Sequence, residues 1–115
     1  MSYSFFPTEL FISEAKKLKK KFPNLANDLR QLRIQLKEDP ITGNDPLGSA
    51  CYKVRLILTD KVAGKSGGAR VIIQIFVQDK IVHLLSIYDK SEKGNLFEGE
   101  LGRILKKKIL RWSKG

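Results

Sequence analysis

Two segments of the sequence alternate apolar and polar residues with the period of two that is typical of β-strands, and most of their polar positions are basic. The first segment covers residues 52–59 and the second covers residues 70–77. If both strands bury their apolar rows, the opposite face of the sheet carries Lys53, Arg55, Arg70 and Gln74. Adjacent strands lie roughly 5 Å apart, so three cations on one face could converge on a phosphate group. The same residues are equally consistent with solubilising side chains on an amphipathic strand.

Other groups of reactive residues give weaker signals. His83 is the single histidine, which excludes a ribonuclease mechanism with one imidazole as base and another as acid, and we expect it to be structural. Asp89 and Glu92 stand among lysines, so we expect ion-paired or solvated carboxylates and no metal centre. The stretch 64–68 lacks the spacing of a phosphate-binding P-loop. Cys51 has no histidine partner nearby in the sequence, so we expect neither a nucleophile nor a zinc ligand there.

The charge of the chain points to an anionic partner. Its 115 residues include 22 Lys and Arg against 12 Asp and Glu, a formal net charge of +10. A nucleic acid is the leading expectation, with acidic membranes and acidic proteins as alternatives. We expect the lysine-rich run 16–21 to be a solvated helix face. No apolar run reaches the ~18 residues of a membrane span and the first 21 residues lack a secretory pattern, which predicts a cytoplasmic protein.

Hydrophobic periodicity predicts the elements that position these residues. We expect strands over 3–6, 52–59, 70–77 and 81–88, helices over 8–22, 25–37 and 96–112, and an irregular loop over 39–49. The order β-α-α-β-β-β-α predicts one α+β domain over residues 1–115. In it, a helical hairpin and a C-terminal helix pack on one face of a small, mainly antiparallel sheet.

Two motifs at a fixed separation carry a family resemblance. Residues 65–72 (Lys-Ser-Gly-Gly-Ala-Arg-Val-Ile) and 84–93 (Leu-Leu-Ser-Ile-Tyr-Asp-Lys-Ser-Glu-Lys) resemble the RelE/ParE superfamily of toxins, in its HigB/RelE-like branch. The resemblance covers nearly the whole chain and implies a RelE-like fold. It also implies a toxin of a type II toxin–antitoxin module that cuts mRNA in the ribosomal A site without a cofactor. The implied partners are a cognate antitoxin, the ribosome with its rRNA, and mRNA.

The resemblance also assigns roles to residues. It implies site positions at Lys53, Arg55, Arg70, Lys90, Lys93 and Phe97. Together with residues that the predicted face and turn offer, we expect a catalytic set of Lys53, Arg55, Lys65, Arg70 and Lys90 and an RNA-binding set of Gln74, Tyr88, Lys93 and Phe97. Arg70 would neutralise charge on the phosphoryl oxygens, Arg55 would hold the phosphate, and Lys53 or Lys65 could assist proton transfer. Several relatives carry a tyrosine near the position of Phe97, but phenylalanine can only stack on a base. Tyr88 could replace that hydroxyl, or the reaction could rest on cations alone.

The reaction implied is a metal-independent transesterification, in which the ribose 2′-OH attacks its own 3′-phosphate and leaves a 2′,3′-cyclic phosphate. One alternative is a ParE-like toxin that acts on DNA gyrase. Another is a non-catalytic RNA- or ribosome-binding domain. The basic surface also suits an antitoxin with an acidic, partly disordered segment, anchored on the first or last helix.

Overall fold

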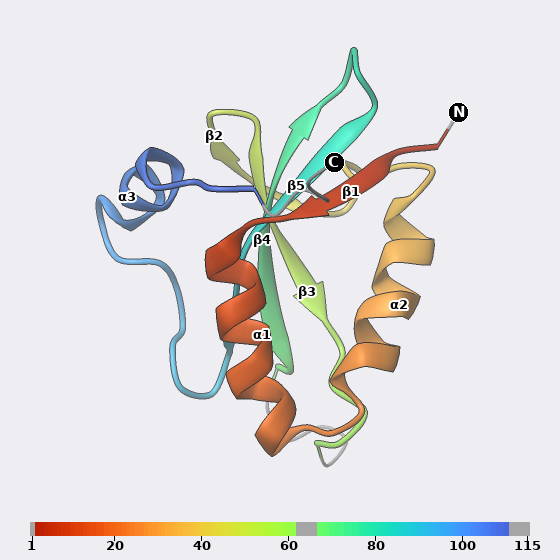
Figure 1. Cartoon of the computed structure of the whole chain (residues 1–115), viewed down its shortest axis with the longest axis vertical. Helices are drawn as coiled ribbons and strands as arrows, with labels where there is room; N and C mark the ends of the chain where they lie inside the picture. The colour runs from red at the N-terminus through yellow and green to blue at the C-terminus, as the bar shows by residue number, and fades with distance from the viewer. Residues whose placement is uncertain (1, 62–66, 111–115) are drawn as a thin grey trace.

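The structure is a computed structural model that describes residues 2–61 and 67–110. Along this part of the chain the elements are β1 (Ser4–Pro7), α1 (Glu9–Lys21), α2 (Leu25–Leu36), β2 (Asp45–Gly48), β3 (Cys51–Leu56), β4 (Ala69–Phe76), β5 (Ile81–Asp89) and α3 (Glu100–Lys106). The strands form one sheet in the order β1-β5-β4-β3-β2 (Figure 1). β1 is parallel to β5, and the other neighbours are antiparallel. These observations confirm the α+β class and the meander of β3, β4 and β5.

The start of α1 is fixed by a side-chain cap. The Thr8 hydroxyl accepts a hydrogen bond from the Phe11 N–H at 3.2 Å and donates one to the Leu85 carbonyl, also at 3.2 Å. The helix ends before Pro23, as the sequence predicts. The lysines of the run 16–21 are exposed, which confirms the solvated face.

The main core lies between the sheet and the hairpin of α1 and α2. The buried residues that β3, β4 and β5 contribute to it are Val54, Leu56, Ala69, Val71, Ile73, Ile75, Val82 and Ile87. On β3 and β4 they occupy alternate positions, so the period of two identifies this face correctly on those strands. On β5 the pairing with β4 shifts by one residue between Leu84 and Ser86, so Val82 and Ile87 face the same core although they are five positions apart. Burying one such side chain stabilises the fold by roughly 1.5–3 kcal/mol.

The opposite face of the sheet is also partly buried, and the prediction that all helices pack on one face is wrong. Ile72 and Leu85 from β4 and β5 form a second apolar cluster there, which includes Cys51 and Tyr88. Partly buried leucine and isoleucine side chains of α3 pack against this cluster. In Figure 1, α3 lies away from the α1–α2 hairpin. The physical reason is that β4 carries three consecutive apolar residues at 71–73, so both of its faces need cover.

Two predicted boundaries also change. The last helix, expected over 96–112, is α3, and it begins after Gly99, whose φ is +82°. Phe97 therefore lies outside the helix with 69% of its surface exposed, and it is not part of an apolar stripe. The loop 39–49 is not wholly irregular, because it contains β2. Within the described residues no helix combines the length and the apolar composition of a membrane span.

The turn between β2 and β3 holds two consecutive non-glycine residues in the left-handed region, Ser49 with φ 53° and Ala50 with φ 62°. Turns of this kind suit the twist of a β-hairpin but favour Asn-Gly. Each L-residue in the left-handed region costs roughly 1–2 kcal/mol.

We expect Ala50→Gly to raise the free energy of unfolding by about 1 kcal/mol, because glycine adopts this conformation without a Cβ clash. Urea denaturation followed by circular dichroism measures the change. The matched control is Ala26→Gly at an exposed position of α2, which we expect to lower stability by about 1 kcal/mol. If Ala50→Gly lowered the free energy of unfolding as much as Ala26→Gly does, the turn would not be strained.

Candidate nucleic-acid interface

The register of the meander places two arginines and a tyrosine side by side. Arg55 on β3 pairs with Arg70 on β4, and Arg70 pairs with Tyr88 on β5. We call these three residues the arginine row. Lys53 lies on the same face one pair further along β3, opposite Ile72. The expectation that Lys53, Arg55 and Arg70 share a face is confirmed.

Neither Arg55 nor Arg70 forms an ion pair in the part of the chain that the structure describes. Arg70 is only 7% exposed, and its Nη1 donates to the carbonyls of Gly67 at 2.5 Å and Ala69 at 3.0 Å. These acceptors are neutral, so they orient the guanidinium without cancelling its charge. Like charges directly opposite on neighbouring strands are destabilising, and an anion between them would remove that cost.

Tyr88 ends the arginine row as a buried side chain, 7% exposed. Its hydroxyl is buried and has no hydrogen-bond partner among the described residues. Burial raises the pKa of Tyr88 above its usual value, and the nearby Arg70 only partly opposes this effect. A buried hydroxyl without a hydrogen-bond partner lowers the free energy of unfolding by about 1–3 kcal/mol. The Tyr88 hydroxyl therefore destabilises the fold next to the arginines.

The segment after β5 brings further cations and an aromatic ring to the arginine row. The Lys93 ammonium lies 5.3 Å from the centre of the Tyr88 ring and 5.2 Å from that of Phe97, and it pairs with Glu100. Glu100 also accepts a hydrogen bond from the Phe97 N–H at 2.8 Å, which holds the exposed Phe97 beside Lys93. Lys93, an expected RNA-binding residue, thus adjoins both Tyr88 and Phe97.

The remaining lysines attach this segment to the sheet. The Lys53 ammonium donates to the Asn95 side chain at 2.8 Å. The Cγ of Lys90 would lie 3.2 Å from a Cβ at position 67, so the Lys90 stem runs along Gly67. Lys53 and Lys90 therefore stand near the arginine row, whereas Lys65 lies outside the described residues.

Gln74 shares the face but is engaged elsewhere. It pairs with Cys51 and His83, two pairs beyond Arg70 along β4. The Lys108 ammonium contacts the Gln74 Oε1 at 2.8 Å and the His83 Nδ1 at 3.0 Å. Burial, together with Lys108, lowers the pKa of His83, in keeping with a structural histidine. Burial also raises the pKa of the Cys51 thiol, which disfavours a nucleophilic thiolate.

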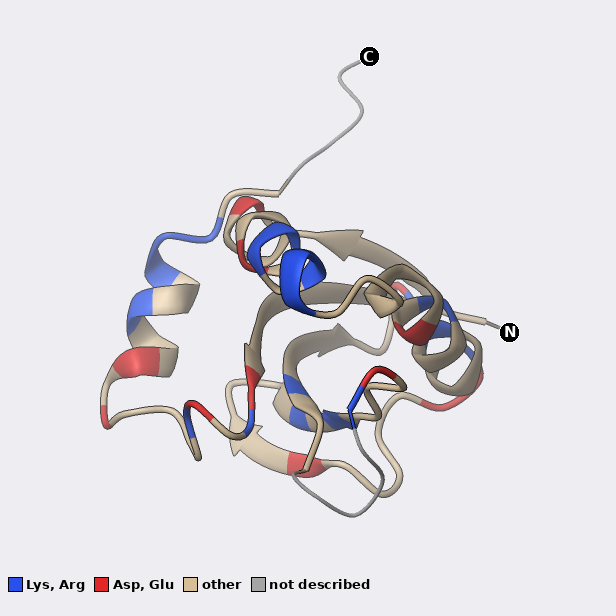
Figure 2. Ribbon diagram, turned by 90° about the horizontal axis from the view of Figure 1, so that it is seen from below, with Lys and Arg blue, Asp and Glu red and all other residues tan. Residues whose placement is uncertain are grey.

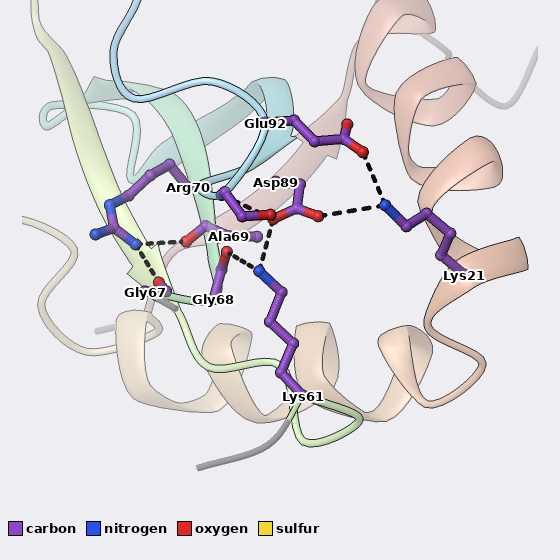
Figure 3. A network of polar contacts seen from close by, with 9 residues as sticks. Lys21, Lys61, Gly67, Gly68, Ala69, Arg70, Asp89 and Glu92 are labelled. Carbon is purple, nitrogen blue, oxygen red and sulfur yellow. Dashed lines mark hydrogen bonds and ion pairs between the residues drawn. The ribbon is translucent and has the colours of Figure 1, made fainter. Parts of the chain in front are cut away.

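A buried ion pair beside the arginine row is absent from the sequence-based prediction. The Asp89 side chain is only 1% exposed and lies 2.6 Å from the Lys61 ammonium (Figure 3). Burial alone raises the pKa of Asp89, but hydrogen bonds from Lys61 and Ser91 outweigh it and hold the pKa below its usual range. Asp89 is ion-paired, as expected, but it is not solvated. The Asp-x-Ser spacing of Asp89 and Ser91, typical of an Asx-turn, was the available signal.

Basic residues are not confined to the arginine row. Figure 2 shows lysines and arginines along α1 and in α3 as well as on the sheet, and both helices carry basic residues in their last turn. The arginine row differs from these surfaces because its cations lie on adjacent strands without acidic partners in the described residues.

Comparison with known proteins supports the fold. No protein-family model and no curated protein matches the sequence. Among solved structures, the chain is similar to the E. coli toxin RelE, in the free state of a mutant with two arginines changed to alanine. The TM-score is 0.61 at 21% sequence identity, and the match covers 90% of this chain and 99% of the RelE chain. The chain therefore has a RelE-like fold, as its motifs imply.

We expect Tyr88→Phe to raise the free energy of unfolding by about 1 kcal/mol, because it removes a buried hydroxyl that has no hydrogen-bond partner in residues 2–61 and 67–110. Denaturant titration gives the change. The control is Ser86→Ala, since the buried Ser86 hydroxyl donates to Glu14 at 2.6 Å and its loss leaves that bond unmade. We expect this variant to lose about 1–3 kcal/mol. A destabilised Tyr88→Phe protein would show that the hydroxyl is well satisfied in solution.

Proposed function

We propose that this protein is a toxin of a type II toxin–antitoxin module and that it acts in the cytoplasm as a ribosome-dependent mRNA endoribonuclease. The observation that carries the proposal is the Arg55–Arg70 pair, in register on adjacent strands and without a carboxylate partner in the described residues. The RelE-like fold and the adjoining Lys53, Lys90 and Lys93 support it. Such a site suits an RNA phosphodiester, which carries the opposite charge.

In the proposed reaction the ribose 2′-oxygen attacks the adjacent phosphorus. A bond from O2′ to phosphorus forms, the bond from phosphorus to O5′ breaks, and the products are a 2′,3′-cyclic phosphate and a 5′-hydroxyl. Arg55 and Arg70 stabilise the charge that gathers on the phosphoryl oxygens. The proton of the 2′-OH must leave and O5′ must gain one. Among the described residues, the neighbours able to exchange protons are Lys53, Lys90, Lys93 and Tyr88, whereas Phe97 can only stack on a base.

The proposed site has no histidine base, so the ribosome must contribute to catalysis by orienting the mRNA. His83 is held by Lys108 two pairs away from Arg70 along β4, so it does not serve as a base at the arginine row. In-line orientation of the attacking oxygen lowers the barrier by several kcal/mol, and the decoding site holds mRNA in a defined conformation. We therefore expect efficient cleavage of mRNA on ribosomes and poor cleavage of free RNA.

In a reconstituted translation reaction, we expect Arg55→Ala to reduce mRNA cleavage about 10²–10³-fold, the usual cost of removing one transition-state donor. Primer extension maps and quantifies the cut ends. Arg55 is exposed, so its truncation leaves the core intact. Arg33→Ala removes the same charge from an exposed position on α2 and should cleave like the unchanged protein.

Three results would contradict the proposal. Intact mRNA with all variants would exclude an mRNA endoribonuclease, and inhibition of DNA gyrase supercoiling would then identify a ParE-like toxin. Equal losses in Arg55→Ala and Arg33→Ala would show that total charge matters and the arginine row does not. Equal cleavage of naked mRNA would remove the ribosome from the mechanism.

The antitoxin is proposed to dock between α1 and α2. An apolar groove there, the α1–α2 groove, comprises adjoining cavities of about 420 and 260 Å³ whose lining includes Phe5, Phe11, Ala15, Ala26, Leu29 and Leu84. Its lining cations are Lys16, Lys19, Arg30 and Arg33, and no acidic residue lines either cavity within the described chain. An acidic amphipathic helix complements both properties of this groove.

We expect Ala26→Glu to weaken antitoxin binding at least tenfold, because it places a negative charge in the apolar groove opposite an acidic partner. Calorimetric titration of the co-encoded acidic protein measures the affinity, with ribosomal cleavage as a check on folding. Gln78→Glu makes the same charge change in the exposed β4–β5 turn and should bind normally. Unchanged affinity of Ala26→Glu would place the antitoxin elsewhere.

A further inference from the structure

The guanidinium of Arg70 is oriented by the backbone that precedes it. Both acceptors of its Nη1, the carbonyls of Gly67 and Ala69, lie within three residues of Arg70 itself. The second nitrogen, Nη2, lies 3.0 Å from the point where a Cβ of residue 67 would stand, so the guanidinium fits against a bare glycine. The position of Arg70 in the arginine row therefore depends on how firmly residues 67–69 are held.

Within this stretch of backbone, Gly68 is held by a close approach to β3 and by hydrogen bonds to its carbonyl. Its φ is +70°, and a Cβ there would lie 2.3 Å from the Leu56 carbonyl oxygen. Its own carbonyl accepts two hydrogen bonds, from the Lys90 N–H at 3.0 Å and from the Lys61 ammonium at 3.3 Å. Lys61 is thus the side chain that ties this backbone to the end of β5.

Lys61 is itself held by a buried carboxylate, as Figure 3 shows. Its ammonium lies 2.6 Å from Asp89, and the two side chains are 12% and 1% exposed. Asp89 also accepts hydrogen bonds from the N–H and hydroxyl of Ser91, at 3.0 and 2.8 Å. Lys21 approaches Asp89 at 3.7 Å, but it is 55% exposed and its closer partner is Glu92, at 2.8 Å.

A buried ion pair of this kind is weak evidence of a stabilising role, because desolvation offsets most of its attraction. What it does provide is a fixed geometry. We infer that Lys61 and Asp89 are positioning residues that clamp the Gly67–Gly68 backbone and so hold the Arg70 guanidinium in the arginine row. This inference rests on the proposed function for its catalytic consequence. The contacts run from Asp89 to Lys61, to the Gly68 carbonyl, and through the Gly67 carbonyl to Arg70.

The first test is single-turnover cleavage of mRNA on ribosomes by Lys61→Met. Methionine keeps an unbranched apolar stem and removes the ammonium, which also lies 5.6 Å from the centre of the Phe22 ring. We expect the cleavage rate to fall by up to about 100-fold, the cost of misplacing a catalytic group by about 1 Å, with ribosome affinity unchanged. Asp89→Asn keeps an acceptor for Ser91 but neutralises the clamp, and it should act in the same direction.

Two comparisons separate positioning from general destabilisation. Lys21→Met also removes a cation from Asp89 but does not touch Gly68, so it should cleave normally. In an Arg70→Ala background, Lys61→Met should cause no further loss, because its effect passes through Arg70. Any of three outcomes would overturn the inference. Lys61→Met could lower the cleavage rate as much in the Arg70→Ala background as in the unchanged protein, Lys21→Met could lower the rate as much as Lys61→Met does, or Lys61→Met could leave the rate unchanged.

A readout independent of cleavage keeps the two proposals distinct. In ¹⁵N NMR spectra, the clamped guanidinium of Arg70 should show separate, slowly exchanging Nη signals, because Nη1 is held by two carbonyls. We expect these signals to merge in Lys61→Met in spectra recorded well below its melting temperature, which falls because the buried Asp89 carboxylate loses its closest cation. If the unchanged protein fails to cut mRNA, the proposed function fails, and the spectra still decide the clamp. Separate signals that persist in Lys61→Met would exclude it.

Discussion

The close approach of two backbones at Gly68 is the constraint on which the candidate site depends. The Leu56 carbonyl lies where any side chain at position 68 would have to stand, so β3 and the start of β4 meet only through glycine. That approach fixes the register in which Arg55 faces Arg70. It also turns the Gly68 carbonyl toward the Lys61 ammonium and the Lys90 N–H. One backbone contact thereby organises both a set of cations and the polar network beneath it.

Burial on both faces of β4 gives this arrangement its rigidity. Val71, Ile72 and Ile73 are fully buried, two of them toward the α1–α2 hairpin and Ile72 toward α3. Side chains packed at the density of a protein interior leave little freedom for a strand to shift. Arg70, the central residue of the arginine row, therefore lies on a strand that is packed on both faces, which suits electrostatic stabilisation by groups already in place.

The sequence predicted what depends on local periodicity and missed what depends on distant contacts. Alternation placed Lys53, Arg55 and Arg70 on one face correctly, because a period of two leaves only two choices for each strand. It could not reveal that Tyr88 is buried, since its cover comes from α3 and the preceding segment. Asp89 stands in a polar stretch, yet its partner Lys61 is 28 positions away. Phe97 lies outside α3, contrary to the prediction, because the helix begins only after Gly99, whose backbone is in the left-handed region.

The parallel pairing of β1 with β5 has a consequence for when the fold can form. Residues 4–7 hydrogen-bond with residues 81–84, and the Glu9 N–H donates to the Ile109 carbonyl. A chain that emerges from the ribosome N-terminus first cannot close its sheet until the residues of β5 have also been synthesised. Until then β1 lacks its neighbour and the Thr8 hydroxyl lacks its Leu85 acceptor. The sheet can therefore close only after β5, which ends at Asp89, has left the ribosome.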